Sequence, residues 1–432
     1  MPSIIANSLR FINADHMTDQ IVNKPTYVVI GKSSSWPDDS IAPNLLNTVD
    51  DALSLQADIL ALKRVVASDM CNVVPRYNWT SGIVYDMYDH RINVINGRKP
   101  TGHRYAFYVM TDEFHVYKCL SNNNGVPSTS KPASQSTSEF TTADGYIWKF
   151  MYTVKPADVF SFLTQEWLPV YSLLANDSST QWNVQQAAVK GGIHAVTLTS
   201  QGTGYNASVP SVTITGNGTG ATATAEVDSV TGKIKRILIT NPGSGYTVAS
   251  VNITSGAGTG AVAVAIISPY KGHGADAREE LGGYYKMIKV NLAGDEGGKF
   301  PTNVSFRQTA LLHKPLGTAN GSMLVMNDVT GLTAGASVTG SSSGATGTIA
   351  LVEQDTKVVW VKSVTGNFTV GDAIGGKTVS AATNATKIVL TDNTAAAADI
   401  TKYSGTLLYM SNRTPIARGS AQTEEVRMVI AF

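Results

Sequence analysis

A glycine-rich pattern occurs twice between residues 191 and 268. The stretches TSQGTGYNASVPSVTITGNGTGATATAEV and TNPGSGYTVASVNITSGAGTGAVAVAII both contain Gly-Ser/Thr-Gly-Tyr, then Val-x-Ile-Thr, then Gly-x-Gly-Thr-Gly-Ala. A spacing of about 40 residues lies in the range of structural repeats. Each copy has short runs of Thr, Val and Ile, which favour strands, between glycines that permit tight turns. Because two units are too few for a long solenoid, the pattern predicts one compact, duplicated β domain.

A second block of the same Gly/Thr/Ala character covers residues 321–391. VTGLTAGASVTG and VTGNFTVGDAIGG are similar to one another, and TGTIALVEQDTKVVWVKSV between them has the pattern of a β-hairpin. The flanking segments 1–190, 269–320 and 392–432 are richer in aromatic and charged residues. Since loops tolerate inserted domains best, we predict one discontinuous body made of these three segments, with 191–268 and 321–391 as two small β insertions.

Charge and cysteine content restrict the possible partners. The chain has 33 basic and 32 acidic residues, a net charge of +1, and only 15% charged residues. This balance provides no electrostatic attraction for nucleic acid or an anionic membrane surface. We see no apolar run long enough to span a membrane and no secretory signal. Cys71 and Cys119 lack the CxxC spacing of a zinc site. We therefore expect no nucleic-acid partner, no membrane insertion, no cofactor, and two buried, reduced thiols in a cytosolic product.

Residues 48–66, TVDDALSLQADILALKRVV, are the segment with the clearest helical pattern. Thr48 can cap the first turn, and Lys63 and Arg64 suit the last turn of such a helix. The apolar residues at near-helical spacing, expected to form its core-packing face, are Val49, Ala52, Leu53, Ile59, Leu60 and Val66.

Most other segments have the character of strands and turns. RYAFYVM (104–110) and FHVYKCL (114–120) predict a hairpin, and YIWKFMYTV (146–154) predicts another strand. Residues 122–145 are a loop by composition. At the C-terminal end, alternation predicts a half-buried strand that turns Val426, Met428, Ile430 and Phe432 to one face and Arg427 to the other.

The stretch YVVIGKSSSWPDD (27–39) resembles the end of a nucleotide-binding phosphate loop. Such a loop needs an early glycine, so that successive backbone N–H groups can curl around the phosphates. Here that position is Thr26, and the β-branched run before Gly31 prefers extended backbone. Ser34 to Pro37 do not begin a helix that could point its dipole at phosphate. The pattern therefore indicates a strand and a turn.

The most suggestive stretch for chemistry is KGHGADAREELGG (271–283). His273 lies between two glycines with Asp276, Glu279 and Glu280 nearby, which imitates a metal or acid–base site. The alternative is a tight turn before a short, solvated helix whose acids are neutralised by Arg278, and we favour it because adjacent glutamates usually face solvent.

No other arrangement indicates catalysis. The seven histidines lack HExxH spacing, the paired acids such as Glu424–Glu425 are adjacent rather than facing, and no GxSxG motif occurs. We therefore expect a protein that is not an enzyme.

The outer segments contain a series of motifs in one order: IGKSSSWPDD, KRVVASDMCNVVPRYNWTSGIVYDMYD, HVYKCLSNNNGVPSTSKP, TTADGYIWKFMYTV, SPYKGHGADAREELGG and GTLLYMSNRTPIARGSAQTEEVRMVIAF. Their content and collinear order resemble the baseplate wedge subunit of T4-like contractile-tailed bacteriophages, the β-sandwich wedge protein often called gene product eight. The resemblance spans the discontinuous body, whereas the two glycine-rich blocks depart from the shorter pattern of that family.

The resemblance implies a β-sandwich body. Together with the strand patterns and the two glycine-rich blocks, this predicts a mainly β fold with a discontinuous β-sandwich body, a few short helices and two inserted small β domains. The resemblance also implies a non-catalytic homodimer in the virion, wedged between other baseplate wedge proteins and relaying conformational change on host contact. Low charge density and exposed strand edges suit a surface used for obligate contacts. Arg and Trp are enriched among interface anchors, although they also serve as internal struts. The residues predicted to contact partners, on motif position, are Arg76, Trp79, Arg278, Glu279 and Arg413.

Two other functions remain open. The first is a receptor- or glycan-binding tail protein that acts through the inserted β modules. Tyr205 and Tyr246 each follow Gly-x-Gly and could stack on sugars, but we favour local packing, which is more common for aromatic residues at repeat turns. The second is a tail-associated hydrolase, which lacks support because no facing acid pair is visible.

Overall fold

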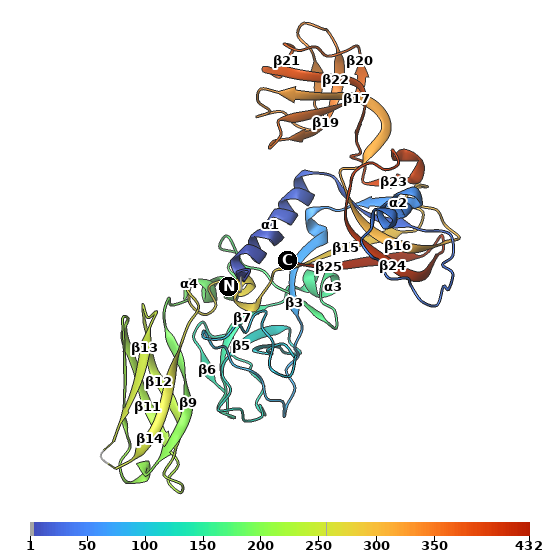
Figure 1. The fold of residues 1–432 in the computed structure, drawn as a ribbon. Coiled ribbons are helices and arrows are strands. Elements are labelled where there is room, and N and C mark those ends of the chain that lie inside the picture. Colours follow the sequence, from blue (N-terminus) through green and yellow to red (C-terminus); the bar gives the residue numbers. More distant parts are fainter. Residues whose placement is uncertain (1–3, 256) are drawn as a thin grey trace. The chain divides into compact units, whose positions relative to one another are not determined.

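The computed structural model describes residues 4–255 and 257–432 (Figure 1). Within these residues the chain forms 25 strands and five α-helices. The helices are α1 (Asn7–Asn23), α2 (Val49–Ala57), α3 (Pro156–Ser161), α4 (Thr180–Gln186) and α5 (Ala277–Leu281). The fold is mainly β, which confirms the predicted class.

The described residues divide into two compact units. Unit 1 comprises the residues up to Phe11, Cys71–Met287 and Ile430–Phe432, and unit 2 comprises Ile12–Met70 and Ile288–Val429. The first glycine-rich block belongs to unit 1 and the second to unit 2. The domain boundaries expected near residues 190, 268, 320 and 391 stay predictions.

The strand that precedes Lys32 lies in the centre of a sheet in unit 2. β1 (Thr26–Gly31) is buried throughout and pairs antiparallel with β2 (Ile59–Arg64) and β16 (Val304–His313). β23 (Thr394–Ala396) and β24 (Thr406–Arg418) complete the order β23-β2-β1-β16-β24. After Gly31, Lys32 has a φ of 64°, and the next helix along the chain is α2. The prediction of a strand and turn, rather than a phosphate loop, is confirmed.

The helix predicted over residues 48–66 is wrong in its second half. α2 ends at Ala57, and the following ILALKR segment is strand β2, which pairs with β1 and β23. Sheet pairing on both sides outweighs a local preference for helix, because propensity is a weak prior. The expected core face is also wrong: Val49 and Leu53 are 76% and 47% exposed, and Leu55 is the buried residue of α2.

Thr48 caps α2 as predicted. Its hydroxyl accepts the Asp51 N–H at 3.1 Å, and the Asp51 carboxylate accepts the Thr48 N–H at 3.1 Å. Thr48→Ala removes one side of this reciprocal pair and is expected to lower the unfolding free energy of unit 2 by about 1 kcal/mol, measured in urea. Thr48→Ser, which keeps the hydroxyl, should stay close to the wild type. Equal losses in both variants would contradict the capping role.

Helix α1 was not predicted from the sequence. Its buried residues, Phe11, Ala14 and Ile21, follow helical spacing, but they are separated by Asn, Asp and Thr residues, which have low helix propensity. Three buried positions in 17 residues produce too weak a periodicity to identify a helix from sequence.

The predicted hairpin and the strand after it form a sheet in unit 1. β4 (Tyr108–Met110) pairs with β5 (His115–Ser121), which pairs with β7 (Ile147–Thr153), and β6 (Phe140–Thr141) completes the order β4-β5-β7-β6. The rest of residues 122–145 is loop, as predicted. β5 and β7 each contain five consecutive buried residues. This burial on both faces encloses two lysines, Lys118 and Lys149.

A four-stranded sheet has the order β25-β15-β3-β8. Its strands are β3 (Met70–Pro75), β8 (Trp167–Pro169), β15 (Tyr285–Ala293) and β25 (Thr423–Ala431). In β25, Met428 is buried and Glu425 is exposed, so the C-terminal strand is half-buried as predicted, but it ends at Ala431 and Phe432 lies just beyond it. Both cysteines are free thiols, as predicted; Cys119 is buried, whereas Cys71 is half-buried and the prediction of its burial is wrong.

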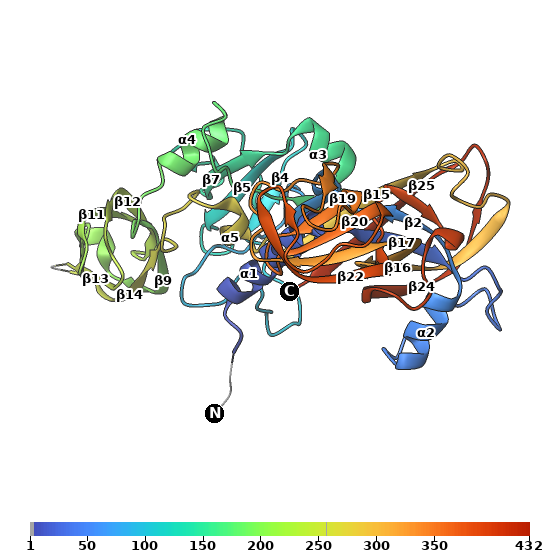
Figure 2. The same cartoon turned by 90° about the horizontal axis from the view of Figure 1, so that it is seen from above.

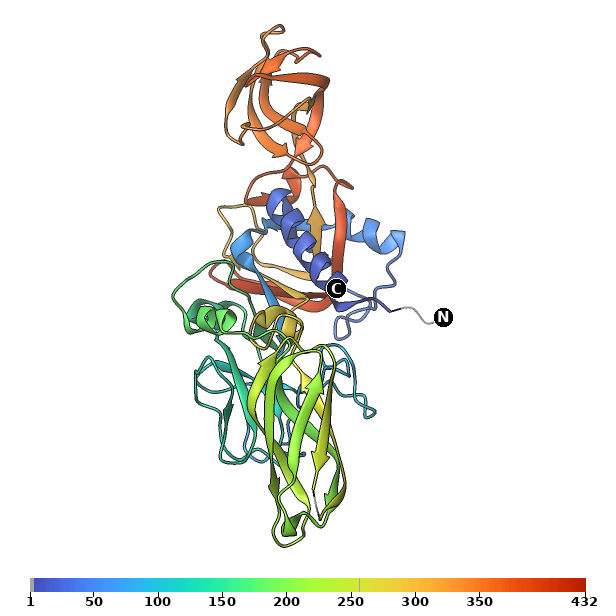
Figure 3. The same ribbon diagram turned by 90° about the vertical axis from the view of Figure 1, so that its left-hand side faces the viewer.

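Six strands formed by residues 193–267 surround one hydrophobic core. Hydrogen bonds join them in the orders β12-β11-β10-β13 and β14-β9. β9 also lies beside β12, and β13 beside β14, so the strands form a ring in the end-on view of Figure 2 and run side by side in Figure 3. The strands of this barrel are β9 (Ile193–Thr203), β10 (Ser211–Gly216), β11 (Thr219–Val227), β12 (Ile234–Ser244), β13 (Ala249–Thr254) and β14 (Thr259–Ile267).

The two sequence copies are intertwined in this barrel. β9, β10 and β11 of the first copy correspond to β12, β13 and β14 of the second, and pairing crosses between copies, as β9 with β14 and β10 with β13. Tyr205 and Tyr246 are only 2% and 4% exposed. Added Cβ atoms at Gly258 and Gly218 would lie 2.3 Å and 2.4 Å from the rings of Tyr205 and Tyr246, respectively. Each tyrosine therefore packs on a glycine of the other copy, which confirms packing over sugar stacking.

The second glycine-rich block forms one sheet with the order β18-β19-β20-β17-β22-β21. β19 and β20 are the predicted hairpin. The core contains Leu324, Ile349, Val361, Phe368 and Val379. The strands are β17 (Leu316–Met326), β18 (Ser337–Thr339), β19 (Thr346–Glu353), β20 (Val358–Thr365), β21 (Ala373–Ile374) and β22 (Lys377–Val389).

None of the helices in residues 4–255 and 257–432 combines the length and apolar character needed to cross a membrane.

Candidate partner interface

An open hollow in unit 1 brings together two of the five predicted contact residues. Its volume is about 730 Å³.

 The hollow lies between the residues that follow β3 and the β4–β5 hairpin. Arg76 and Trp79 line it, as do Met110, Asp112, Phe114 and Lys131. A volume of this size is typical of sites that hold a ligand or a partner's side chains.

Trp79 is held rigidly at this hollow. Its backbone N–H donates to the Met110 carbonyl at 2.9 Å, and its indole Nε1–H donates to the Ser128 hydroxyl at 3.1 Å. The Ser128 hydroxyl in turn donates to the Asp144 carboxylate at 2.9 Å. The indole is therefore fixed by a chain of hydrogen bonds, as expected of an anchor whose conformation is set before a partner binds.

Arg76 is held by neutral groups. Its Nε donates to the Asn78 side-chain oxygen at 2.8 Å, and its Nη1 donates to the Thr164 carbonyl at 2.6 Å. Among the residues that the structure describes, no carboxylate lies within ion-pair distance of this guanidinium. Arg76 thus brings an uncompensated positive charge to one rim of the hollow.

The other rim, formed by Asp112 and Glu113 of the β4–β5 hairpin together with Lys131, has the opposite charge. Lys131 Nζ lies 2.7 Å from Asp112 Oδ1 and 2.5 Å from Glu113 Oε1, so one ammonium serves two carboxylates. The hydrogen bond from Lys131 lowers the pKa of Glu113 to about 2, which keeps that carboxylate ionised at neutral pH. The rim formed by these three residues therefore has one excess negative charge.

Phe114 is the lining residue that the sequence analysis missed. It ends the turn between β4 and β5, where its N–H donates to the Thr111 carbonyl at 3.0 Å and the Thr111 N–H donates to the His115 carbonyl at 2.9 Å. Its φ is 62°, and the residue is 37% exposed. The one sequence indication is the position itself, because Gly or Asn usually occupies the left-handed residue of such a turn.

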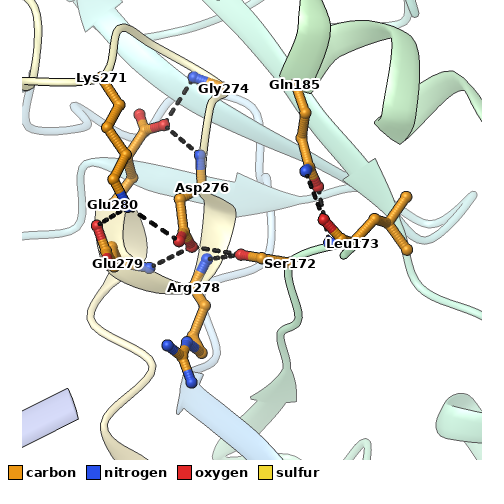
Figure 4. Close-up of polar contacts among 9 residues, drawn as sticks. All are labelled: Ser172, Leu173, Gln185, Lys271, Gly274, Asp276, Arg278, Glu279 and Glu280. Carbon is orange, nitrogen blue, oxygen red and sulfur yellow. Dashed lines mark hydrogen bonds and ion pairs between the residues drawn. The ribbon is translucent and has the colours of Figure 1, made fainter. Parts of the chain in front are cut away.

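Arg278 and Glu279 lie on α5, in the stretch that imitated a metal or acid–base site (Figure 4). The tight turn and short helix are confirmed: Gly272 and Gly274 have positive φ, and Asp276 caps α5 by accepting the Glu279 N–H at 3.0 Å. The neutralising role given to Arg278 stays a prediction. Glu279 pairs with Lys271 at 3.0 Å, while the Arg278 guanidinium lies 5.8 Å from the centre of the Phe11 ring.

Glu280 is buried, so the expectation of two solvated glutamates holds for Glu279 alone. Its carboxylate lies 2.7 Å from Lys118 Nζ and accepts the N–H groups of Gly274 and Asp276 at 2.7 Å and 3.3 Å. The Lys118 ammonium also lies 4.1 Å from the centre of the Tyr88 ring. Burial lowers the pKa of Lys118, and Glu280 opposes that shift. Sequence could not reveal this pair, because its members are 162 positions apart.

Two histidines lie next to this ion pair. The ring centres of His194 and His273 are 5.2 Å apart, and His194 Nδ1 lies 3.0 Å from Glu139 Oε1. Burial lowers the pKa of His273 well below its ordinary value, and Lys118, His194 and Lys149 reinforce the shift, which Glu139 opposes. The groups that face His273 are Lys118 on β5, Lys149 on β7, Glu280 on α5, His194 on β9, Glu139 and Tyr88.

His273 is expected to make the stability of unit 1 depend on pH. Because its folded pKa is below the unfolded value of about 6.5, protons favour the unfolded state, and stability falls as the pH decreases below 6.5. Between pH 7.5 and pH 5 the loss should be at most about 2 kcal/mol, the limit set by the unfolded pKa of about 6.5. Urea unfolding at both pH values should show this loss in the wild type and in His103→Gln, an exposed control, but not in His273→Gln. A loss of equal size in His273→Gln would contradict the assignment.

Arg413 belongs to unit 2, whereas the other four predicted residues belong to unit 1. It lines a separate hollow of ≈ 440 Å³ together with Glu424 and Arg427. Its carbonyl accepts the Trp36 Nε1–H at 2.9 Å. Arg76 and Trp79 share a hollow, Arg278 and Glu279 share a helix, and Arg413 borders a hollow of unit 2; their contact with partners stays a prediction.

In residues 4–255 and 257–432, no group of three or more His, Cys, Asp or Glu side chains is placed to hold a metal ion. Comparison with protein-family models and with curated proteins finds no match to this chain.

Proposed function

We propose that this chain is a structural subunit of a contractile phage tail baseplate wedge. It links neighbouring baseplate proteins in the virion and relays conformational change on host contact, without catalysis. The collinear motifs of the outer segments support the family assignment, and the mainly β fold is compatible with it. Following the same resemblance, we propose that the subunit acts as a homodimer, which analytical ultracentrifugation would detect as a mass of two chains.

The observation that most favours a structural role is the way in which the ionisable side chains of unit 1 are used. Glu280 and Lys118 are buried and satisfied by one another and by backbone N–H groups. A general acid or base must instead reach a substrate proton. The open hollow beside Arg76 and Trp79 has the aromatic and arginine content of a protein interface.

The alternative is glycan binding through the inserted β modules, and the two tyrosines proposed to bind sugars are buried. Tyr205 and Tyr246 are core residues of the barrel, with each hydroxyl accepting a backbone N–H at 3.3 Å. Structural assembly is therefore the better-supported function.

Electron microscopy of tails from the phage that encodes this chain tests the proposal. We expect density for the two units in the wedge ring of the baseplate, in contact with neighbouring subunits. Tails that lack the chain, or that present it only as a distal fibre, would refute the proposal. Purified protein should release no reducing sugar from host envelope, and such release would instead support the hydrolase hypothesis.

A further inference from the structure

Phe114 has a backbone conformation that does not suit its side chain. At a φ of 62° the Cβ of an L-residue is crowded by the backbone, which is why glycine or asparagine is usual at this position of a hairpin. Bulky residues in this conformation are outliers, and such strain concentrates at functional sites.

Burial does not offset this strain. Phe114 is 37% exposed and lines the same hollow as Trp79, and it does not belong to the buried clusters of the sheet. An exposed aromatic ring at a strained position gains little in the isolated chain. It gains more if a partner covers it, because the covered area then leaves water.

The hollow carries charges of both signs: the hairpin rim has one excess negative charge, from Asp112, Glu113 and Lys131, so a carboxylate of an occupant is favoured only beside Arg76. Arg76 lies on one rim without a carboxylate partner, and the guanidinium fork is suited to receive a carboxylate. Trp79, Met110 and Phe114 provide the apolar surface of the same hollow. An acidic residue next to an apolar side chain matches both features.

We propose that the hollow bordered by Arg76, Trp79 and Phe114 binds an acidic residue and an adjacent apolar side chain of a neighbouring polypeptide. Phe114 is held in its left-handed conformation to contact the apolar side chain, and Arg76 receives the carboxylate. The choice of a polypeptide over another ligand rests on the proposed function.

The test uses acetyl-Leu-Glu-amide as probe and the full chain labelled with 5-fluorotryptophan. Fluorine NMR resolves the six tryptophans, and Trp79→Phe assigns the relevant signal. We expect a saturable shift of the Trp79 signal with millimolar affinity, in keeping with so small a ligand. Acetyl-Leu-Gln-amide, which lacks the charge, should bind about fivefold more weakly, and Arg76→Gln should remove that difference.

Phe114→Gly should lower the affinity for the probe by about tenfold, as expected when an anchor residue is removed. The chain should stay folded, because glycine suits the turn. Phe114→Asn serves as a second variant that tolerates the same backbone. Tyr403→Gly is the matched control, since Tyr403 is also an exposed aromatic with positive φ, at 57% exposure and 60°, but belongs to unit 2. It should leave probe binding unchanged.

Three outcomes would overturn the proposal: no saturable shift at Trp79, equal binding to Phe114→Gly and the wild type, or binding of maltotriose in place of the peptide. These outcomes are independent of the tail map. A chain located in the baseplate that fails to bind the probe would retain the proposed function and lose this inference. A chain that binds the probe but is absent from the baseplate would support the binding of an acidic peptide and refute the proposed function.

Discussion

Replacing Glu280 with Gln is expected to lower the unfolding free energy of unit 1 by about 3–5 kcal/mol. The change leaves the Lys118 ammonium buried between β5 and α5 without its carboxylate partner, which lies 2.7 Å away in the wild type. A buried charge that loses its counter-ion retains the full cost of leaving water. Urea unfolding followed by tryptophan fluorescence measures the loss.

A double variant provides the control. Lys118→Met with Glu280→Gln removes both charges and should recover most of the loss, since a buried pair is often no more stable than an apolar replacement of similar volume. The sign also separates two functions. If Glu280 has a structural role, its replacement lowers the stability of the protein. Replacing a catalytic group often leaves stability unchanged or raises it, at the expense of activity. A neutral or stabilising Glu280→Gln would therefore contradict the structural role.

Tyr205→Ala is expected to destabilise the barrel of residues 193–267 by about 3–5 kcal/mol, because it leaves a cavity where the ring packs on Gly258. Tyr205→Phe should cost only about 1 kcal/mol, since it removes the hydroxyl that accepts the Ala261 N–H at 3.3 Å. Thermal unfolding and hydrogen exchange of the β9–β14 strands would show both effects.

The corresponding tyrosine supplies a test of the duplication. Tyr246 packs on Gly218 and accepts the Ala221 N–H at the same distance, so Tyr246→Ala should have an effect similar to that of Tyr205→Ala. If either alanine variant kept its stability and lost only affinity for a glycan, the tyrosines would be binding residues, and the packing role would be wrong.

Local pattern was sufficient where neighbouring residues in the sequence are neighbours in space. The β4–β5 hairpin, the β19–β20 hairpin and strand β7 have patterns that match their structure, and the Thr48 cap is a contact over three residues. Arg76 and Trp79 line one hollow for the same reason, because they are three positions apart just after β3.

Local pattern failed where distant segments decide. The ILALKR segment lacks the helix expected of it because β1 and β23 lie on either side and provide its hydrogen bonds. The acids of α5 were assigned to Arg278, the nearest cation in sequence, whereas Glu280 pairs with a lysine from β5. Phe114 was recognised as a candidate contact residue only from its positive φ, which the residue type alone does not reveal.

The order of residues by itself determined the mainly β class, the duplication and the turns, because strand alternation and glycine spacing act over a few residues. Only the tertiary structure decided which charges are buried with partners, which tyrosines fill a core, and which aromatic ring is left at an open surface. Those outcomes depend on which distant strands exclude water from a side chain, and no local pattern contains that information.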